Sequence, residues 1–387
     1  MIRKFESVEE AYQALVHERA IQVAQFTNGQ VRDVVDLLGG LLGELDETIG
    51  ARLANISARG PDVDFRSTKR LQALRATITD LVSETIREAR AVALPDLRRF
   101  GVVEAKWAVQ ALTDTYPFQL ATTVPPAPLL RSLVTSRPFE GALWGDHWTG
   151  LEAVTRRNIE REVLRGITSG EGHEQIVRRL RGTRANGYRG VWKTTKQHAA
   201  TVVRTAANHV SAQARVETAK ENRRLIRSER FIATLDARTT DICFSLHGRE
   251  FAIGEGDIPP MHMRCRSTRS PVPFSFRDLG IDVDDPQFTI AARQYDDPFS
   301  ATVRRVKDTT TTETYLRNQP RSVVEKALGK GKAEVFLNGR VPLSRFVDRE
   351  LNPLRLDELI ELDRRAAAAG RRLPEFQRPG QVPRKSG

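Results

Sequence analysis

The 387-residue sequence has few cysteines, few aromatic residues and no long apolar run. Its two cysteines, Cys243 and Cys265, are too few for a disulfide framework, so we expect free thiols or a metal site. No stretch approaches the roughly 18 consecutive apolar residues that a membrane-spanning helix needs. The start, residues 1–10, is charged and unlike a secretory signal. These absences predict a protein that is made and kept in a cytoplasm.

The chain has moderate apolar content and an excess of positive charge. Hydrophobic residues make up 40% of it and aromatic residues 6%, which is typical of a helix-rich chain with cores of Leu, Val, Ile and Ala. The formal net charge is +12. Residues 151–230 contain 18 Lys and Arg against 8 Asp and Glu, so this one region holds +10. We therefore expect a polyanionic partner.

Two helices are expected within this basic region, at residues 171–181 and 194–221. Its arginines would neutralise phosphates without reading bases, or would contact acidic surfaces of partner subunits. The alternative is a solvated helix face. The candidate contact residues are Arg178, Arg179, Arg181, Arg184, Arg189, Arg223, Arg224 and Arg227.

Apolar residues at helical spacing predict four more helices before this region. Pro95 is expected to end or bend the third of them. Residues 116–150 are rich in Pro, Thr, Gly and Trp, which indicates an irregular connection, and Trp144, Trp148 and Trp192 are expected to fill cores. The four predicted helices are Val8–Arg19, Val31–Leu53, Thr68–Val92 and Val102–Asp114.

After residue 230 the pattern changes from helices to short strands and turns. Phe231–Leu235 and Arg249–Ile253 are predicted strands on either side of a turn at His247-Gly248. Pro259-Pro260 then leads to His262. We expect a small β-rich module here.

Cys243, His262 and Cys265 form a C-x18-H-x2-C pattern that suits zinc. A structural zinc site needs a fourth ligand, for which His247 and Asp236 are the candidates. Bound metal would supply folding free energy to a module with little apolar material. In the alternative, the thiols are inert and buried, His262 is a turn histidine, and Asp236 accepts hydrogen bonds from Arg238 and from turn amides.

An enzymatic function is not expected. A cysteine followed by a histidine is the chain order of papain-like nucleophile pairs, and a basic protein with metal ligands could be a nuclease. The sequence has no H-E-x-x-H motif, no Gly-rich phosphate loop and no carboxylate cluster for two-metal chemistry.

The order of residues in this segment resembles the Mu F-like phage head morphogenesis family, also called minor head or minor capsid proteins. Many members have a second cysteine before the turn, where this chain has Thr240. Residues 315–359 resemble the tail that follows the motif in one branch of the family. The motif falls on Arg204-Thr205, Leu235-Asp236-Ala237-Arg238-Thr239, Cys243, Gly248, Pro259-Pro260-Met261-His262 and Cys265-Arg266.

The resemblance implies a low-copy protein of the virion, in the capsid interior near the portal and in the host cytoplasm during assembly. It implies a role in head assembly, DNA packaging or DNA delivery. The implied partners are the portal protein, the major capsid protein and packaged DNA, which would be bound independently of sequence. The alternatives are a nonspecific DNA-binding protein acting outside particles, and a toxin-like or hydrolytic enzyme that carries a delivery module.

The expected fold class is mainly α: long helices, a small β-rich Cys/His module and a small mixed α/β C-terminal module. In the C-terminal module we expect a helix at residues 322–328, a turn at Asn338-Gly339 after residues 334–336, and a helix at residues 357–369. The expected division is 1–145 (N-terminal helices), 146–230 (basic helices), 231–275 (Cys/His module), 276–370 (C-terminal module) and 371–387 (flexible tail).

Overall fold

The computed structural model describes residues 2–5, 7–57, 69–116, 120–183, 189–236, 238–282, 284, 288–291, 312–348, 352–374 and 378–382. Its described part is mainly α-helical with a small antiparallel sheet, which confirms the expected fold class. None of the described helices is long and apolar enough to cross a membrane. The chain divides into two compact units, and both are discontinuous in sequence. Unit 1 comprises Met1–Ile21, Val102–Leu130 and Ser211–Gly387, and unit 2 comprises Gln22–Gly101 and Arg131–Val210.

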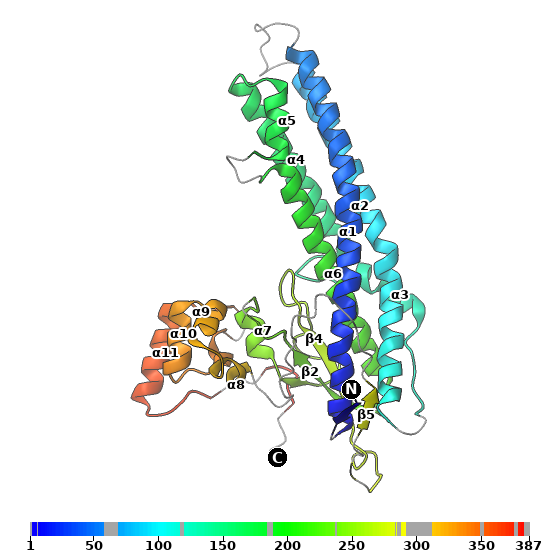
Figure 1. Ribbon diagram of the computed structural model, residues 1–387, viewed down its shortest axis with the longest axis vertical. Coiled ribbons are helices and arrows are strands. Elements are labelled where there is room, and N and C mark those ends of the chain that lie inside the picture. Colours follow the sequence, from blue (N-terminus) through cyan, green and yellow to red (C-terminus); the bar gives the residue numbers. More distant parts are fainter. Residues whose placement is uncertain are drawn as a thin grey trace. The chain divides into compact units, whose positions relative to one another are not determined.

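Unit 2 is a helical bundle, in which long helices lie side by side (Figure 1). Its core is made by apolar residues that recur every three or four positions, such as Leu38, Leu42 and Leu45. Trp144 and Trp148 are fully buried in the same core, as expected. The helices that contribute to this unit are α1 (Val8–Ser57), α2 (Lys69–Asp114), α3 (Ala127–Ser136), α4 (Trp144–Thr168), α5 (His173–Arg181) and α6 (Val191–Glu221).

Two of these helices are longer than their sequence patterns predict. Helix α1 runs unbroken through residues 20–30, where the buried Gln30 side chain donates a hydrogen bond of 2.9 Å to Asp96. Helix α2 continues through Pro95, which neither ends it nor separates a second helix at Val102. Ala93 and Leu97 on either side of the proline are completely buried, so packing compensates for the hydrogen bond that proline removes.

Helix α6 is a core helix, in contrast to the solvated face considered for the basic region. From residue 199 to 219 most of its side chains are buried, and most of them are small, including many alanines. It ends at Glu221, and Ile226 already begins a strand. Arg227 therefore lies on that strand, and does not close the helix.

The sheets of unit 1 are small and antiparallel. One has the order β3-β2-β4, in which β2 (Ile226–Ile232) lies between β3 (Glu250–Phe251) and β4 (Thr268–Pro273). The other pairs β1 (Ile2–Phe5) with β5 (Phe288–Ala291). Helix α7 (Asp241–Leu246) connects β2 to β3 (Figure 1).

The C-terminal module of unit 1 packs around an apolar cluster that includes Phe336, Phe346 and, from α7, Phe244. Residues 334–336, which lead to the predicted turn at Asn338-Gly339, are helical in this cluster. Residues 378–382 were expected to be flexible, but the amide of Val382 donates to Glu250 of β3. The helices are α8 (Thr312–Arg317), α9 (Arg321–Leu328), α10 (Lys330–Asn338), the 3-10 helix η2 (Leu343–Arg345) and α11 (Leu356–Ala368).

A buried carboxylate joins the helices of unit 1 to its sheet. Glu104 of α2 is fully buried and accepts from Arg19 of α1 at 2.9 Å and from Arg215 of α6 at 2.8 Å. Arg215, also buried, donates to the Thr268 hydroxyl of β4 at 3.0 Å. Both guanidinium groups lie over the Trp107 ring, with centroid distances of 5.3 and 5.0 Å. Three helices and a strand are thereby held in one relative orientation.

We expect Glu104→Gln to destabilise unit 1 strongly. The substitution keeps the side-chain volume but leaves two guanidinium groups without their counter-charge, one of them buried, at a cost of about 3–5 kcal/mol. Glu84→Gln on the same helix is the matched control, since that side chain is 59% exposed and its pair with Arg87 is worth at most about 1 kcal/mol. Urea unfolding followed by circular dichroism measures both; equal shifts of the two midpoints would contradict a structural role for this pair.

Candidate metal centre

Three donor atoms of unit 1 lie close enough together to hold a metal ion. Cys243 Sγ is 3.4 Å from His262 Nε2 and 3.7 Å from Cys265 Sγ. The three atoms all lie within 4.8 Å of one another, and both cysteines are buried while His262 is partly exposed. The spacing pattern in the sequence therefore identified a real cluster.

Cys243 is positioned by the start of helix α7. The Thr240 hydroxyl is the N-cap of this helix and accepts a hydrogen bond from the Cys243 amide. Thr240 stands where many members of the family it resembles have a second cysteine. At this position the chain has a hydroxyl that caps the helix and no thiol that could bind a metal.

His262 and Cys265 come from one tight turn after Pro259-Pro260. The Cys265 amide donates to the His262 carbonyl at 3.0 Å, which closes the turn. His262 Nδ1 lies 2.9 Å from the Met263 carbonyl oxygen, so Nδ1 is the donor and Nε2 keeps its lone pair toward Cys243. Metal-binding histidines are commonly oriented by a hydrogen bond of this kind.

The two thiols have different acidities because of their surroundings. The hydrogen bond from Cys243 lowers the pKa of Cys265, and the interaction with His262 and the hydrogen bonds from the amides of Met261 and Ser267 act in the same direction. The pKa of Cys243 is raised by its interaction with Cys265 and by burial. The cluster therefore favours one thiolate, the form of cysteine that binds metals.

Neither candidate for a fourth ligand, His247 or Asp236, belongs to this group of donor atoms. Both oxygens of Asp236 accept from the Arg266 guanidinium at 2.6 Å, and Oδ1 also accepts from the Arg238 amide at 2.8 Å. His247 Nδ1 accepts from the Ala233 amide at 3.0 Å. Among the described His, Cys, Asp and Glu residues, only the three donors above are grouped in this way.

The remaining motif residues hold the backbone around the cluster. The Thr239 hydroxyl donates to the Thr234 carbonyl. Gly248 has a φ of +75°, a conformation that favours glycine, and its amide donates to Phe231 of β2 at 2.8 Å. Pro259 is buried in the turn before His262. Arg204, which belongs to unit 2, lies on helix α6.

A second buried charge pair supports the sheet behind the cluster, and nothing in the sequence signals it. Glu229 of β2 and Arg269 of β4 are both completely buried, with 3.8 Å between Oε2 and Nη1. Arg269 also stacks over the Phe251 ring of β3 at 4.3 Å, and the Gly254 amide donates to Glu229 at 2.7 Å. Burial raises the pKa of Glu229, and Arg269 opposes that shift. The pair joins all three strands.

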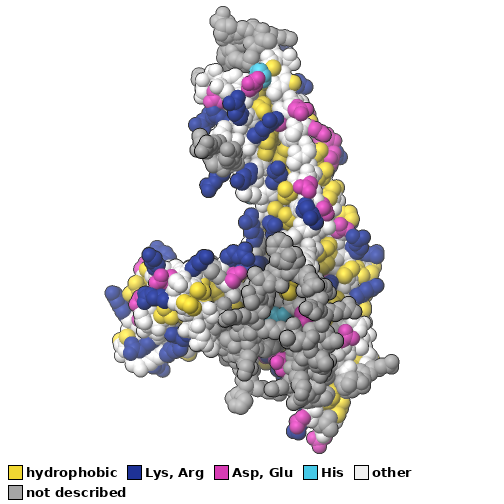
Figure 2. All heavy atoms as spheres, viewed as in Figure 1, with side chains coloured by type: hydrophobic (Ala, Val, Ile, Leu, Met, Phe, Trp, Pro, Cys, Tyr) yellow, Lys and Arg dark blue, Asp and Glu magenta, His cyan; other side chains and the backbone are white. Residues whose placement is uncertain are grey.

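The candidate contact arginines divide into paired and unpaired side chains. Arg179 and Arg181 in unit 2 and Arg227 in unit 1 form ion pairs within their own units. Their positive charges are therefore already balanced by carboxylates of the same unit. Arg184 lies outside the described residues. Over α4 and α5, the face in Figure 2 has more dark-blue Lys and Arg side chains than magenta Asp and Glu. The candidates that are exposed and make no ion pair with a described residue are Arg178, Arg189, Arg223 and Arg224.

Comparison with known proteins places a family match on this part of the chain. Residues 157–270 match the family model described as phage Mu protein F like protein. The match extends from α4 to β4 and includes the motif and all three metal-cluster residues. Neither the curated proteins nor the solved structures give a match to this chain. The resemblance noted in the sequence is thus confirmed for residues 157–270.

Replacement of Asp236 by Asn tests the ion pair between Asp236 and Arg266 beside the metal cluster. Hydrogen bonds from Arg266 lower the pKa of Asp236 to about 2, below its ordinary value of 3.8. The carboxylate therefore stabilises the fold above pH 4, and this contribution disappears as the pH falls from about 4 to 2. Because the side chain is 35% exposed, we expect Asp236→Asn to cost only about 1 kcal/mol at pH 7.

Urea unfolding at pH 7, 4 and 2.5 measures this effect. The variant should lose less stability than the original chain between pH 4 and 2.5, because its side chain cannot titrate. Asp33→Asn, at an exposed position of α1 without an ion pair to a described residue, should follow the original chain. Identical pH profiles for all three proteins would show that the ion pair between Asp236 and Arg266 does not stabilise the fold.

Proposed function

Starting from the Mu F-like segment at residues 157–270, we propose that the protein is a minor head, or minor capsid, protein of a bacteriophage. The observation that supports this most is that the family match and the assembled motif coincide. The same segment contains the ion pair between Asp236 and Arg266 and the cluster formed by Cys243, His262 and Cys265.

In this proposal the protein is a low-copy component of the capsid interior near the portal, and is present in the host cytoplasm during assembly. Its partners are the portal protein and the major capsid protein, and its role lies in head assembly, DNA packaging or DNA delivery. The long helices of unit 2 would provide the surface for such contacts. The Cys/His module would act as a rigid docking element.

The proposed role is structural and not enzymatic. Cys243 is 1% exposed, and its sulfur lies against Cys265 and His262, so no open face of the sulfur is presented to a substrate. A nucleophilic cysteine would have to reach its substrate through partly exposed surroundings. Burial of this kind suits a side chain that holds a metal or a core.

We further propose that the cluster binds Zn²⁺ as a structural ion. Tetrahedral zinc with Zn–S bonds of about 2.3 Å and a Zn–N bond of about 2.0 Å places the sulfurs about 3.8 Å apart and the nitrogen about 3.5 Å from sulfur. The corresponding separations between the donors are 3.7 and 3.4 Å. Three residues would hold the ion, and water or a partner's side chain would complete the tetrahedron. Zinc would supply folding free energy where the apolar core is small.

Metal analysis tests the zinc proposal. The full chain, purified with zinc present and then dialysed, should retain about one zinc per chain by elemental mass spectrometry, and a chelator should lower its melting temperature. Cys243→Ser and His262→Ala should bind zinc at least tenfold more weakly, whereas His198→Ala, an exposed histidine of α6, should bind it normally. A chain that stays folded, holds no zinc and is insensitive to the chelator would contradict the proposal.

Particle composition tests the proposed function. Quantitative mass spectrometry of purified procapsids and virions of the encoding phage should count a few copies of this chain per particle, relative to portal and major capsid protein. Loss of these copies after DNA ejection would support a role in delivery. Absence from both particles, with the portal protein detected normally, would overturn the proposal in favour of a DNA-binding protein or enzyme that acts outside particles.

A further inference from the structure

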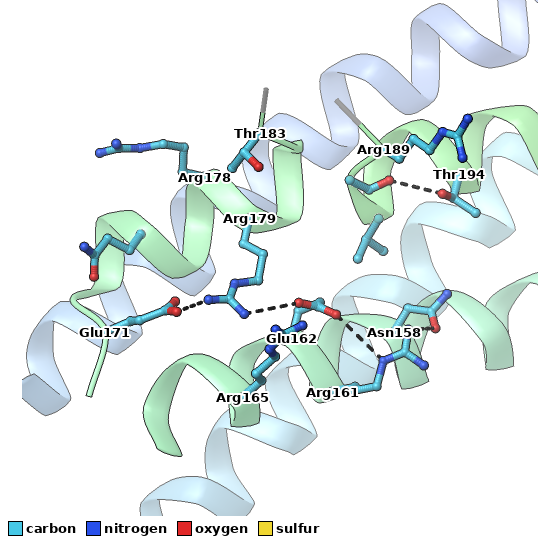
Figure 3. Close-up of a pocket in the computed structure, with 13 residues that line it drawn as sticks. Asn158, Arg161, Glu162, Arg165, Glu171, Arg178, Arg179, Thr183, Arg189 and Thr194 are labelled. Atoms are coloured by element: carbon cyan, nitrogen blue, oxygen red, sulfur yellow. Dashed lines mark hydrogen bonds and ion pairs between the residues drawn. The ribbon is translucent and has the colours of Figure 1, made fainter. Parts of the chain in front are cut away.

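Unit 2 contains a strongly basic pocket that involves none of the metal-cluster residues. It has a volume of about 540 Å³ and lies between the second half of α4, helix α5 and the first turn of α6 (Figure 3). Five arginines and two glutamates are among its lining residues, so the charged lining has a net charge of +3. The arginines are Arg161, Arg165, Arg178, Arg179 and Arg189.

Ion pairing within the pocket uses both carboxylates and leaves most of the arginines free. Arg179 lies between Glu171 and Glu162, with 3.7 Å to the latter, and Arg161 is 3.8 Å from Glu162 (Figure 3). The pair with Glu171 is the closer contact. The excess charge consequently remains on the exposed side chains Arg165, Arg178 and Arg189, which make no ion pair with any described residue.

The beginning of α6 adds positive potential to the same pocket. Gly190 and Val191 line it, and the Gly190 carbonyl accepts from the Thr194 amide at 3.2 Å as the first turn forms. A Cβ on residue 190 would lie 2.3 Å from the backbone of Arg181, so glycine allows the helix start to lie directly against the end of α5. The first amides of a helix lack partners within the helix, which gives the start of this 31-residue helix a partial positive charge.

The surrounding cations favour a polymer of phosphates over a single small anion. Arg157, Arg161 and Arg165 of α4 recur every four residues and are all exposed. Side chains four apart on a helix are separated by about 5–6 Å, so this row presents repeated positive charge along the axis of α4. Arg189, just before α6, and Lys193, in its first turn, are exposed as well. Arginine forks bind phosphate oxygens in a bidentate manner.

The lining also argues against an acidic protein segment as the occupant. Val191 is the single apolar side chain among the described lining residues, and none of them is aromatic. Apolar contacts help to hold a peptide and aromatic side chains stack on bases, and this lining offers little of the first and none of the second. Contact with phosphates alone needs neither and is independent of base sequence.

We propose that this pocket binds the phosphodiester backbone of nucleic acid. Arg165, Arg178 and Arg189 contact the phosphate oxygens, while the charge of Arg179 is balanced by its two glutamates. The inference depends on the pocket alone, and holds whether or not the protein is part of a particle.

Fluorescence polarisation with a labelled 20-base-pair DNA duplex of arbitrary sequence, at several salt concentrations, tests the inference on the full chain. We expect the triple variant Arg165→Gln, Arg178→Gln, Arg189→Gln to lower affinity at least tenfold at low salt. Because each phosphate contact contributes about 0.9 to the slope of log K against log salt, the slope should fall by about 3. An unrelated duplex should bind equally well.

The matched control removes the same charge elsewhere on unit 2. Arg32→Gln, Arg98→Gln and Arg131→Gln change three exposed arginines that make no ion pair with a described residue, and this variant should lose less than about threefold. Equal losses in the two triple variants, or competition by a poly-glutamate peptide that matches that of unlabelled duplex, would overturn the phosphodiester assignment. If DNA binding is lost while particles still incorporate the triple variant, the pocket and the particle role are separate properties.

Discussion

The carboxylate of Glu104 is the point on which the arrangement of unit 1 depends. It is fully buried, and Arg19, Ser211 and Arg215 all donate to it. A buried charge contributes little net stability, since desolvation offsets the Coulomb attraction. It is costly in any other arrangement, however, because the buried charge would then lack its partners. Arg215 extends that geometry to Thr268, the first residue of β4, which follows the turn that ends in Cys265. The orientation of the helices and the position of the metal cluster are thus linked.

The sequence identified the cluster but not its surroundings. Cys243, His262 and Cys265 could be found because thiols and imidazoles at short spacing are rare and chemically specific. Asp236 could not be excluded as a ligand, because a carboxylate pairs with whichever cation the fold brings to it, and that cation is Arg266 from the same motif. Thr240 is understood only once it is seen to cap α7. Residue type predicts chemical capability, and tertiary structure selects the partner.

Burial of charge was the feature least accessible to prediction. Glu104, Arg215, Glu229 and Arg269 occur in ordinary helix and strand patterns, where charged residues are normally assigned to the solvent side. The predicted helix lengths were too short for a related reason. Pro95 lies within α2 because the packing of its neighbours outweighs the tendency of proline to end a helix. The apolar periodicities of α1, α2 and α5 were predictable, since burial of a single face dominates there. Much of α6, which lies within the basic region 151–230, is core.

Because unit 1 is discontinuous in sequence, its parts are synthesised at different times. All residues of unit 2 have been synthesised once Val210 has left the ribosome, whereas unit 1 still requires everything from Ser211 onward. The helical bundle can therefore close its core first, while the segment of α2 around Glu104 stays hydrated until Arg215 is made. Burial of Glu104 is costly until its buried partner Arg215 has been made, so we expect the arrangement around Glu104 to form after the bundle.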